Sequence, residues 1–341
     1  MTIVAGPPRR RIASPGHRCD SSLEYLASLS VMHLRQLHAL LAVAEHHSFS
    51  AAARALHTVQ SNVSTHVARL EREVGATLID RERSELTTEG AVVASRARRM
   101  IAELRAIEDD LVALRDELSG TVRVGVIGTT ARWLVPAILD ATTQQHPRVN
   151  LQIIEATTTT LIPQLLDDRL DVAVANLPVV DPDIDTESLF LEDRIVVAPL
   201  GHALASCERV DLSELAEHEI LLPPIGTAFR DEIEADARKA RIKLSTRAEV
   251  DGLRLLSSLA FQGFAPALVP VSAAPDWLQG DFVRIPVDGL SRREVGLAVR
   301  RRFSPSAPTR AVAELIRTVV GETCADQGGL TPASSPGADT L

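Results

Sequence analysis

The chemistry that stands out in this sequence is a set of short hydrogen-bonding side chains and one cation on a single face of a predicted helix. The face consists of Gln60, Ser61, Asn62, Ser64, Thr65, His66 and Arg69. Amides and hydroxyls can donate to and accept from base edges in the major groove of DNA, and arginine binds phosphate. Gln60 is the candidate for a bidentate contact with adenine. A packed pair of helices with a solvated polar face would show the same pattern, so both interpretations stand on these residues alone.

The elements that must position this face are two short helices joined by a tight turn. The opposite face of the second helix is apolar, with residues at steps of four, three and four: Val63, Val67, Leu70 and Val74. Such spacing predicts one buried stripe. Ser50 is expected to cap the preceding helix, which contains three consecutive alanines, and Leu56 to close it. His57 and Thr58 would make the turn.

The wider stretch of residues 34–89 resembles the winged helix-turn-helix of LysR-type transcriptional regulators. The resemblance rests on LRQL, SFSAAARAL, the Gln-Ser-x-x-Ser start of the next helix, RLEREVG, TLIDR and LTTEG, in family order and spacing. Val59 stands where a capping Ser is common, Ser61 where Pro is common and Thr65 where Arg is common. These departures, with a short loop at residues 82–85, concern sequence preference and wing contacts.

The resemblance implies a DNA-binding surface made of Ser50, the polar face above and two wing arginines. Arg81 and Arg83 follow the recognition helix, where such arginines lie against phosphates or in the minor groove. A solvated turn is the alternative for these two residues.

A long helix is predicted from Thr88 to about Leu118. Its apolar residues follow steps of 4, 3, 4, 3, 4, 3 and 4: Val93, Ala97, Met100, Leu104, Ile107, Leu111, Leu114 and Leu118. A period of about 3.5 is typical of a coiled-coil seam, which one helix cannot bury alone. In the family this is the linker helix that pairs two subunits, so the resemblance implies a homodimer or a homotetramer that presents two recognition helices to two half-sites.

Strands and helices alternate after residue 120, which predicts two α/β lobes. The expected fold class is α plus α/β: a winged helix-turn-helix over residues 32–90, the linker helix over 91–119 and an effector domain over 120–320. The effector domain resembles that of the same family, which is similar to periplasmic binding proteins. Lobe I is expected at about 120–194 and 296–320, and lobe II at about 195–295. Residues 1–31 and 321–341 are expected to be disordered, with Met32 as the natural start or the extension dispensable.

In open α/β sheets, ligands bind beyond the carboxyl ends of the strands, near the N-termini of helices. The predicted strands place eight residues there: Thr129, Thr130, Thr157, Thr158, Thr159, Asn176, Thr227 and Phe264. The resemblance implies that such positions line a cleft for a small molecule, often a carboxylate. Ordinary helix capping by threonine is the alternative. The glycines of GVIG are too few for a dinucleotide loop, so we expect no cofactor apart from a small-molecule co-inducer.

Charge and cysteine usage bound the remaining possibilities. The net charge is −9, yet residues 1–31 hold four Arg against two acids and residues 32–100 nine Arg against seven, so the acidic excess lies in the rest. The acidic part is expected to stay off DNA. Cys19, Cys207 and Cys324 have no paired spacing, which argues for a reducing compartment and against a zinc site. No apolar run of about 18 residues and no cleavable leader are evident, which favours the cytoplasm.

The sequence therefore predicts a sequence-specific DNA-binding transcriptional regulator whose activity a small molecule modulates. Its expected partners are duplex DNA, further copies of itself, the effector and RNA polymerase. A metabolic enzyme on the lobes is one alternative, but no Ser/His/Asp order, HExxH or phosphate loop supports it. A sensor that does not touch DNA is another, against which the helix-turn-helix argues. We expect no enzymatic activity.

Overall fold

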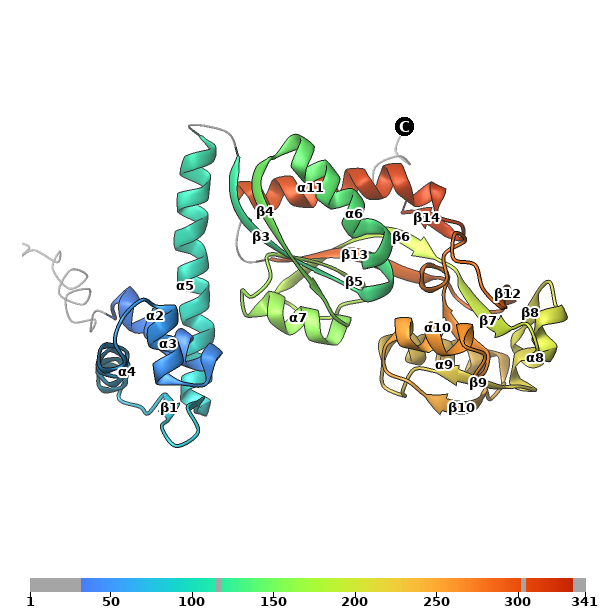
Figure 1. Cartoon of the computed structure of the whole chain (residues 1–341), viewed down its shortest axis with the longest axis horizontal. Helices are drawn as coiled ribbons and strands as arrows, with labels where there is room; N and C mark the ends of the chain where they lie inside the picture. The colour runs from blue at the N-terminus through green and yellow to red at the C-terminus, as the bar shows by residue number, and fades with distance from the viewer. Residues whose placement is uncertain (1–31, 115–117, 302–304, 334–341) are drawn as a thin grey trace, which may run out of the picture. The chain divides into compact units, whose positions relative to one another are not determined.

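The computed structural model describes residues 32–114, 118–301 and 305–333 of the 341-residue chain. The expected N-terminal extension over residues 1–31 lies outside these ranges. The chain divides after Ala97 into two compact units, each of which is described by itself. Figure 1 labels their helices and strands along the chain.

The first unit is a helix-turn-helix followed by a two-stranded wing, as the sequence predicts. Its elements are α2 (Leu34–His46), α3 (Phe49–Ala55), α4 (Gln60–Val74), β1 (Ile79–Asp80), β2 (Glu85–Leu86) and the start of α5 (Thr88–Ala113). The predicted stripe on α4 is confirmed at Val63, Val67 and Leu70, which are fully buried. Val74 is half-buried at the end of the helix. Burial of this one face leaves the polar face of α4 free.

The predicted cap of α3 is wrong by two residues. The helix begins at Phe49, and Ser48, with an extended backbone, accepts a hydrogen bond from a first-turn N–H. Ser50 therefore lies inside the first turn, where its hydroxyl cannot occupy the cap position. The predicted turn is confirmed, because Leu56 ends α3 and His57 adopts a left-handed φ of 51°.

The linker helix α5 ends at Ala113, earlier than the sequence predicts. Leu118 fits the heptad spacing, but it precedes a strand and packs against the core of the next domain. Core burial therefore outcompetes continuation of the helix at this position. The middle of the predicted seam, Met100, Leu104, Ile107 and Leu111, is 41–56% exposed in the single chain. These residues carry an apolar stripe that the chain itself leaves uncovered.

Lobe I is built on a six-stranded sheet in the order β14-β6-β13-β5-β3-β4. Its strands are β3 (Ser119–Val126), β4 (Arg148–Glu155), β5 (Val172–Asn176), β6 (Ile184–Glu192), β13 (Arg293–Arg300) and β14 (Leu330–Pro332). The parallel strands β3, β4 and β5 form the predicted βαβαβ unit, and β13 runs antiparallel to β5 and β6. Its helices are α6 (Gly128–Gln145), α7 (Thr158–Leu166) and α11 (Ala307–Thr323).

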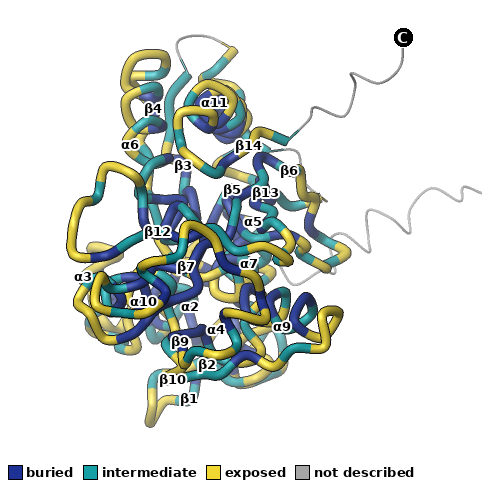
Figure 2. Tube along the Cα trace, turned by 90° about the vertical axis from the view of Figure 1, so that its right-hand side faces the viewer, coloured by how far each residue is buried: buried dark blue, intermediate teal, exposed yellow. Residues whose placement is uncertain are grey.

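Lobe II has a second six-stranded sheet in the order β10-β9-β11-β7-β12-β8. Its strands are β7 (Arg194–Pro199), β8 (Val210–Asp211), β9 (Glu219–Leu222), β10 (Ser245–Glu249), β11 (Ala267–Pro270) and β12 (Phe282–Asp288). Its helices are α8 (Leu212–Ala216), α9 (Ala228–Ala240) and α10 (Leu253–Phe261), with short 3-10 turns at Ala203–Ser206 and Val271–Ala273. The chain passes between the lobes twice, from β6 to β7 and from β12 to β13. In Figure 2 the buried stretches of the trace follow the central strands.

The segment after residue 320 is not the loose tail that its composition suggests. Helix α11 continues to Thr323, a 3-10 turn follows at Cys324–Asp326, and β14 pairs with β6 at the edge of the sheet. Cys324 is fully buried and Leu330 is 8% exposed, so apolar burial orders this segment. Residues 334–341 lie outside the described part. None of the described helices is long and apolar enough to cross a membrane.

Candidate functional site

The recognition helix presents its predicted polar side chains on one exposed face. Gln60, Ser61, Asn62, Thr65 and Arg69 are exposed, and Ser64 and His66 are half-buried. Within this set, the Thr65 hydroxyl donates to the Ser61 carbonyl at 2.8 Å, and the Ser50 hydroxyl donates to Gln60 Oε1 at 3.2 Å. The Gln60 amide nitrogen remains available for a base edge. The arrangement has the side-chain types and exposure that reading a major groove requires.

The two predicted wing arginines have different surroundings. Arg81 pairs with Glu71 at 3.1 Å, and its guanidinium lies 5.7 Å from the centre of the Phe49 ring. Glu71 also accepts hydrogen bonds from the backbone N–H groups of Leu78 and Ile79, at 2.9 and 3.2 Å. Arg81 thus connects the wing to α3 and α4, and its guanidinium is less available for contact with DNA than the sequence suggests. The Arg83 side chain is exposed at the tip of the wing.

A cavity of about 330 Å³ lies between lobes I and II and collects most of the predicted effector residues. The ones that line it are Thr129, Thr157, Thr158, Thr159, Asn176 and Thr227. Thr130 does not line it, because this side chain turns into the core and is fully buried. Phe264 does not line it either, because it follows the C-terminal end of α10 and is 62% exposed.

Four helices begin at this cleft, and none has a side-chain cap. The first residues of α6, α7, α9 and α10 all line the cavity, and the positions before them, Ile127, Thr157, Thr227 and Gly252, make no capping hydrogen bond. The free N–H groups and the dipoles of four helix N-termini therefore favour negative charge in one place.

The floor of the cleft holds a buried arginine that the sequence did not single out. Arg293 is 1% exposed and pairs with Glu192, which is fully buried, at 3.0 Å. Arg293 Nε donates to Asn176 Oδ1 at 2.6 Å, and Nη1 donates to the Thr129 hydroxyl at 3.0 Å. Burial lowers the pKa of the Arg293 guanidinium, and Glu192 opposes that shift. Among the described residues, Arg293 Nη2 has no hydrogen-bond partner.

The mouth of the cleft is bridged by an ion pair between the lobes. Arg254 at the start of α10 donates to both carboxylate oxygens of Glu155, at 2.7 and 2.5 Å, and both side chains are half exposed. Phe229 on α9 forms part of the wall, with the guanidinium groups of Arg194 and Arg293 5.3 and 5.9 Å from its ring centre. Sequence reasoning missed Glu155, Phe229 and Arg254, because no spacing pattern connects them, and it left Arg194 unassigned as an arginine of a common surface type.

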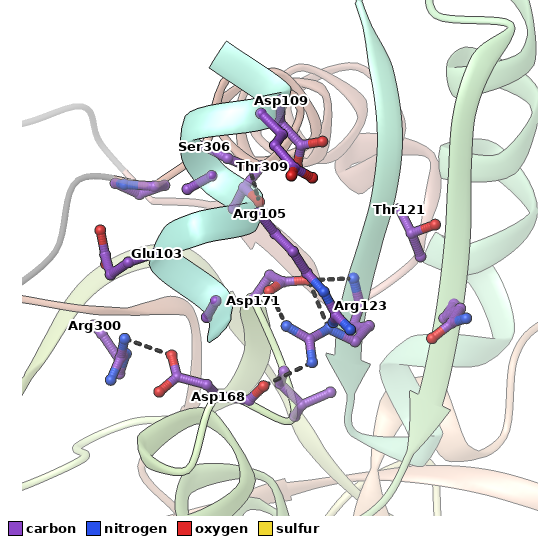
Figure 3. A pocket seen from close by; sticks show the side chains of 16 residues that line it. Glu103, Arg105, Asp109, Thr121, Arg123, Asp168, Asp171, Arg300, Ser306 and Thr309 are labelled. Atoms are coloured by element: carbon purple, nitrogen blue, oxygen red, sulfur yellow. Dashed lines mark hydrogen bonds and ion pairs between the residues drawn. The ribbon is translucent and has the colours of Figure 1, made fainter. Parts of the chain in front are cut away.

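A second hollow, of about 420 Å³, lies between α5 and the opposite end of the lobe I sheet (Figure 3). Its base is an ion-pair network in which Arg123 binds Asp171 through Nη2 at 2.6 Å and donates from Nη1 to the Asp168 carbonyl at 2.6 Å. The Asp168 carboxylate pairs with Arg300. Burial raises the pKa of Asp168 to about 6, and the neighbouring arginines oppose the shift. This network fixes the loop between α7 and β5.

Neither cysteine of the described residues belongs to the cleft. Cys324 is buried in lobe I, and burial raises the pKa of its thiol to about 11. Cys207 follows a 3-10 turn in lobe II and does not line the cavity. Within the described ranges, no group of three or more His, Cys, Asp or Glu residues could hold a metal ion. The chemistry of the cleft is therefore hydrogen bonding and charge.

Comparison with known proteins gives two family matches that together span most of the chain. Residues 34–91 match the bacterial regulatory helix-turn-helix protein, lysR family, and residues 115–321 match the LysR substrate binding domain. A probable hydrogen peroxide-inducible genes activator of Streptomyces viridosporus is 33% identical over 290 residues, covering 84% of this chain and 88% of that protein.

Solved structures share the fold. A full-length OxyR from Pseudomonas aeruginosa, with one cysteine replaced by aspartate, is 24% identical and superposes with a TM-score of 0.71 over 89% of this chain and 99% of that one. Full-length CbnR, solved in complex with its target DNA, is 24% identical and superposes with a TM-score of 0.64 over 84% of this chain and 99% of that one.

Proposed function

Because the chain belongs to the LysR family of helix-turn-helix transcriptional regulators, we propose that a small carboxylate with an apolar body regulates it by reversible binding between lobes I and II. The chain is a DNA-binding transcriptional regulator that responds to an effector and acts as an oligomer. The proposal concerns the chemistry of the effector and the residues that contact it and the DNA.

The observation that carries the proposal is the convergence of four uncapped helix N-termini on the free nitrogen of a buried arginine. Arg293 Nη2 and most of the first-turn N–H groups have no acceptor among the described residues, the Thr160 N–H being an exception, and a carboxylate satisfies such donors. The walls also include the apolar residues Ile127, Pro223, Phe229 and Leu253. An anionic group at the floor and an apolar body against the walls would use both features.

The lobes give such a ligand a way to act on the DNA-binding unit. A ligand that contacts both lobes stabilises the lobe arrangement to which it binds better, and this shifts the population of the oligomer. On the DNA side, we propose that Gln60 reads adenine, that Ser61, Asn62, Ser64 and Thr65 contact bases or phosphates, and that Arg69 and Arg83 contact phosphates. RNA polymerase is a proposed partner at the promoter, and the cytoplasm is the proposed location because the DNA is there.

The names of several relatives refer to hydrogen peroxide, and a cysteine thiol is one group that could respond to such an oxidant. An oxidant-sensing cysteine needs an accessible thiolate. Cys324 does not meet this requirement, because it is fully buried with a pKa raised to about 11; Cys207 is half-buried and does not line the cleft. We also propose that the cleft is not catalytic, because Glu155, Arg254 and Arg293 are engaged in ion pairs, which leaves Asp251 as the one other titratable side chain among the described lining residues.

The test is thermal denaturation of the full-length protein with isobutyrate, hexanoate and phenylacetate, each beside its neutral primary amide. A ligand at about one hundred times its Kd stabilises the folded state by about 2.7 kcal/mol, so carboxylates should raise the Tm and the amides should not. Thr159→Val, in the cleft, should weaken the response. Thr143→Val, an exposed threonine of α6 outside the cleft, should retain it. Equal shifts with acid and amide, or none with any carboxylate, would contradict the proposal.

A further inference from the structure

A shallow hollow on the DNA-binding unit is lined by basic side chains and by no acid. It has a volume of about 580 Å³ and lies between the first turn of α2 and the middle of α4. Its lining residues are Met32, His33, Leu34, Arg35, Gln36, His66 and Arg69. Arg35 of α2, His66 and Arg69 of α4, and His33, which precedes α2, thus line one surface depression, which suits an anion.

The charges at this hollow are only partly neutralised. Arg69 is held by Glu73, from Nε to Oε1 at 2.9 Å, and both terminal nitrogens of its guanidinium are without a hydrogen-bond partner in the described part of the chain. Glu73 also accepts from the Gln36 amide at 3.1 Å, and the hydrogen bond from Arg69 is the main cause that lowers the pKa of Glu73. Arg35 has neither an ion pair nor a side-chain hydrogen bond among the described residues, and it is exposed.

The charge balance of the unit makes the place of each cation important. Residues 32–97 contain seven Arg and seven Asp or Glu, so the unit has no net positive charge apart from its histidines. Arg81 is paired with Glu71, and Arg69 with Glu73. Attraction to phosphate must therefore come from local groups that remain unpaired, and Arg35 is such a group next to the recognition helix.

The distance along α4 places this hollow at the edge of a major groove. The rise of about 1.5 Å per residue puts His66 about 9 Å and Arg69 about 13.5 Å beyond Gln60 along the helix axis. The major groove is about 12 Å wide. With Gln60 against base edges, the hollow therefore lies where the sugar-phosphate backbone borders the groove.

We propose that this hollow binds a DNA backbone phosphate, with Arg35 as a donor beside Arg69, whose phosphate contact is part of the proposed function on which this inference rests. The start of α2 then holds the strand that flanks the groove entered by α4. Such a contact fixes the position and angle of the recognition helix and carries no sequence information. It adds the first turn of α2 to a DNA-binding surface that otherwise consists of the polar face of α4 and the wing.

The experiment measures binding of the full-length protein to a fluorescein-labelled 40-base-pair duplex of random sequence, by anisotropy, at several NaCl concentrations. Each phosphate contact contributes about 0.9 to the slope of log K against log salt. Arg35→Ala should lower this slope by about 0.9 for each bound subunit, which corresponds to about an eightfold loss per subunit at 0.1 M salt relative to 1 M. Arg35→Lys should keep the slope, because it keeps the charge.

The matched control is Arg247→Ala, which removes an exposed arginine of lobe II and should leave the slope unchanged. A wild-type slope for Arg35→Ala overturns the proposal, and so does an equal fall for Arg247→Ala. A loss confined to one duplex sequence also overturns it, since that would make Arg35 a base-reading residue. If Arg35→Ala lowers the Tm, the salt slopes of Arg35→Gln and Arg35→Lys are compared instead. A lower slope for Arg35→Gln alone then shows that the charge matters, and equal slopes show that the loss came from the fold. An Arg35-dependent Tm shift with inorganic phosphate but an unchanged DNA slope would refute the backbone contact.

Discussion

Replacing Arg293 with methionine perturbs the charge network at the floor of the cleft most directly. Methionine keeps an unbranched apolar stem and removes the cation. Glu192 then remains fully buried with the Ser272 N–H, 2.7 Å from Oε1, as its remaining donor. Removing one partner of a buried ion pair costs about 3–5 kcal/mol, because the other charge is left uncompensated. For a unit of this size, about 1 kcal/mol shifts Tm by about 2–4 °C, so the expected fall is roughly 6–20 °C.

The assay is urea unfolding of the full-length protein, read by circular dichroism, as a double-mutant cycle with Glu192→Gln. Each single variant leaves one buried charge without its partner, whereas Arg293→Met with Glu192→Gln removes both. The double variant should therefore be more stable than the sum of the singles predicts. Arg301→Met, one residue beyond the end of β13, is the control: Arg301 pairs with Asp185, both side chains are more than half exposed, and the pair should contribute at most about 1 kcal/mol.

The reasoning would be refuted by a loss below about 1 kcal/mol for Arg293→Met, or by strict additivity in the cycle. The first result would mean that Glu192 reaches water or takes up a proton at little cost. The second would mean that the two charges do not stabilise each other, whatever their distance.

Three further predictions test other parts of the molecule. Burial raises the pKa of Asp168 in the folded state to about 6 from 3.8. The stability of the wild type, relative to that of Asp168→Asn, should therefore fall by up to about 3 kcal/mol as the pH rises from 4 to 6 and stay level above pH 6. Urea unfolding at several pH values measures this difference, and a difference that does not change with pH would contradict the prediction. Gln60→Ala should weaken binding to a duplex selected from a random pool by about 1–3 kcal/mol and spare unselected duplex in gel shifts; equal losses on both would remove Gln60 from base reading. Ile107→Glu places a charge on the uncovered stripe of α5 and should dissociate the oligomer in analytical ultracentrifugation; an unchanged mass would move the interface elsewhere.

The helix-turn-helix could be predicted from the sequence, because burial of one helix face requires apolar residues at helical spacing and this spacing is visible in the sequence. Val63, Val67 and Leu70 are apolar for the same reason that they are buried. The ends of elements were less predictable. Ser48 and Ser50 are chemically equal candidates for the cap, and Leu118 satisfies the heptad although it belongs to the lobe I core. A local sequence pattern cannot decide which of two serines caps a helix, or whether an apolar side chain packs in a helix seam or in a domain core.

The cleft was predictable only where the rule for parallel strands applies. The threonines follow the carboxyl ends of β3 and β4, where that rule places a ligand. Arg293 stands at the start of β13, and β13 runs antiparallel to β5, with Val295 opposite Asn176. Because β13 is antiparallel to β5, the start of β13 lies at the same edge of the sheet as the carboxyl ends of the parallel strands. Arg293 therefore reaches the cleft from the start of a strand, whereas the rule considers only the ends of parallel strands. Glu192 ends β6, a strand that was not predicted because its buried positions do not alternate.

The same two residues connect the cleft to the passages of the chain between the lobes. Glu192 is the last residue of β6 before the first passage, and Arg293 is the first residue of β13 after the second. Their ion pair therefore ties the two connections together at the floor of the cleft, and the residue before β14 adds a backbone hydrogen bond from the Asp193 N–H to the Gly329 carbonyl at 2.9 Å. A carboxylate that binds Arg293 Nη2 would place a second negative charge beside the guanidinium that already pairs with Glu192 through Nη1. Under the proposed function, ligand binding changes the electrostatic balance at the point where both lobes are joined, and no separate relay through either core is needed.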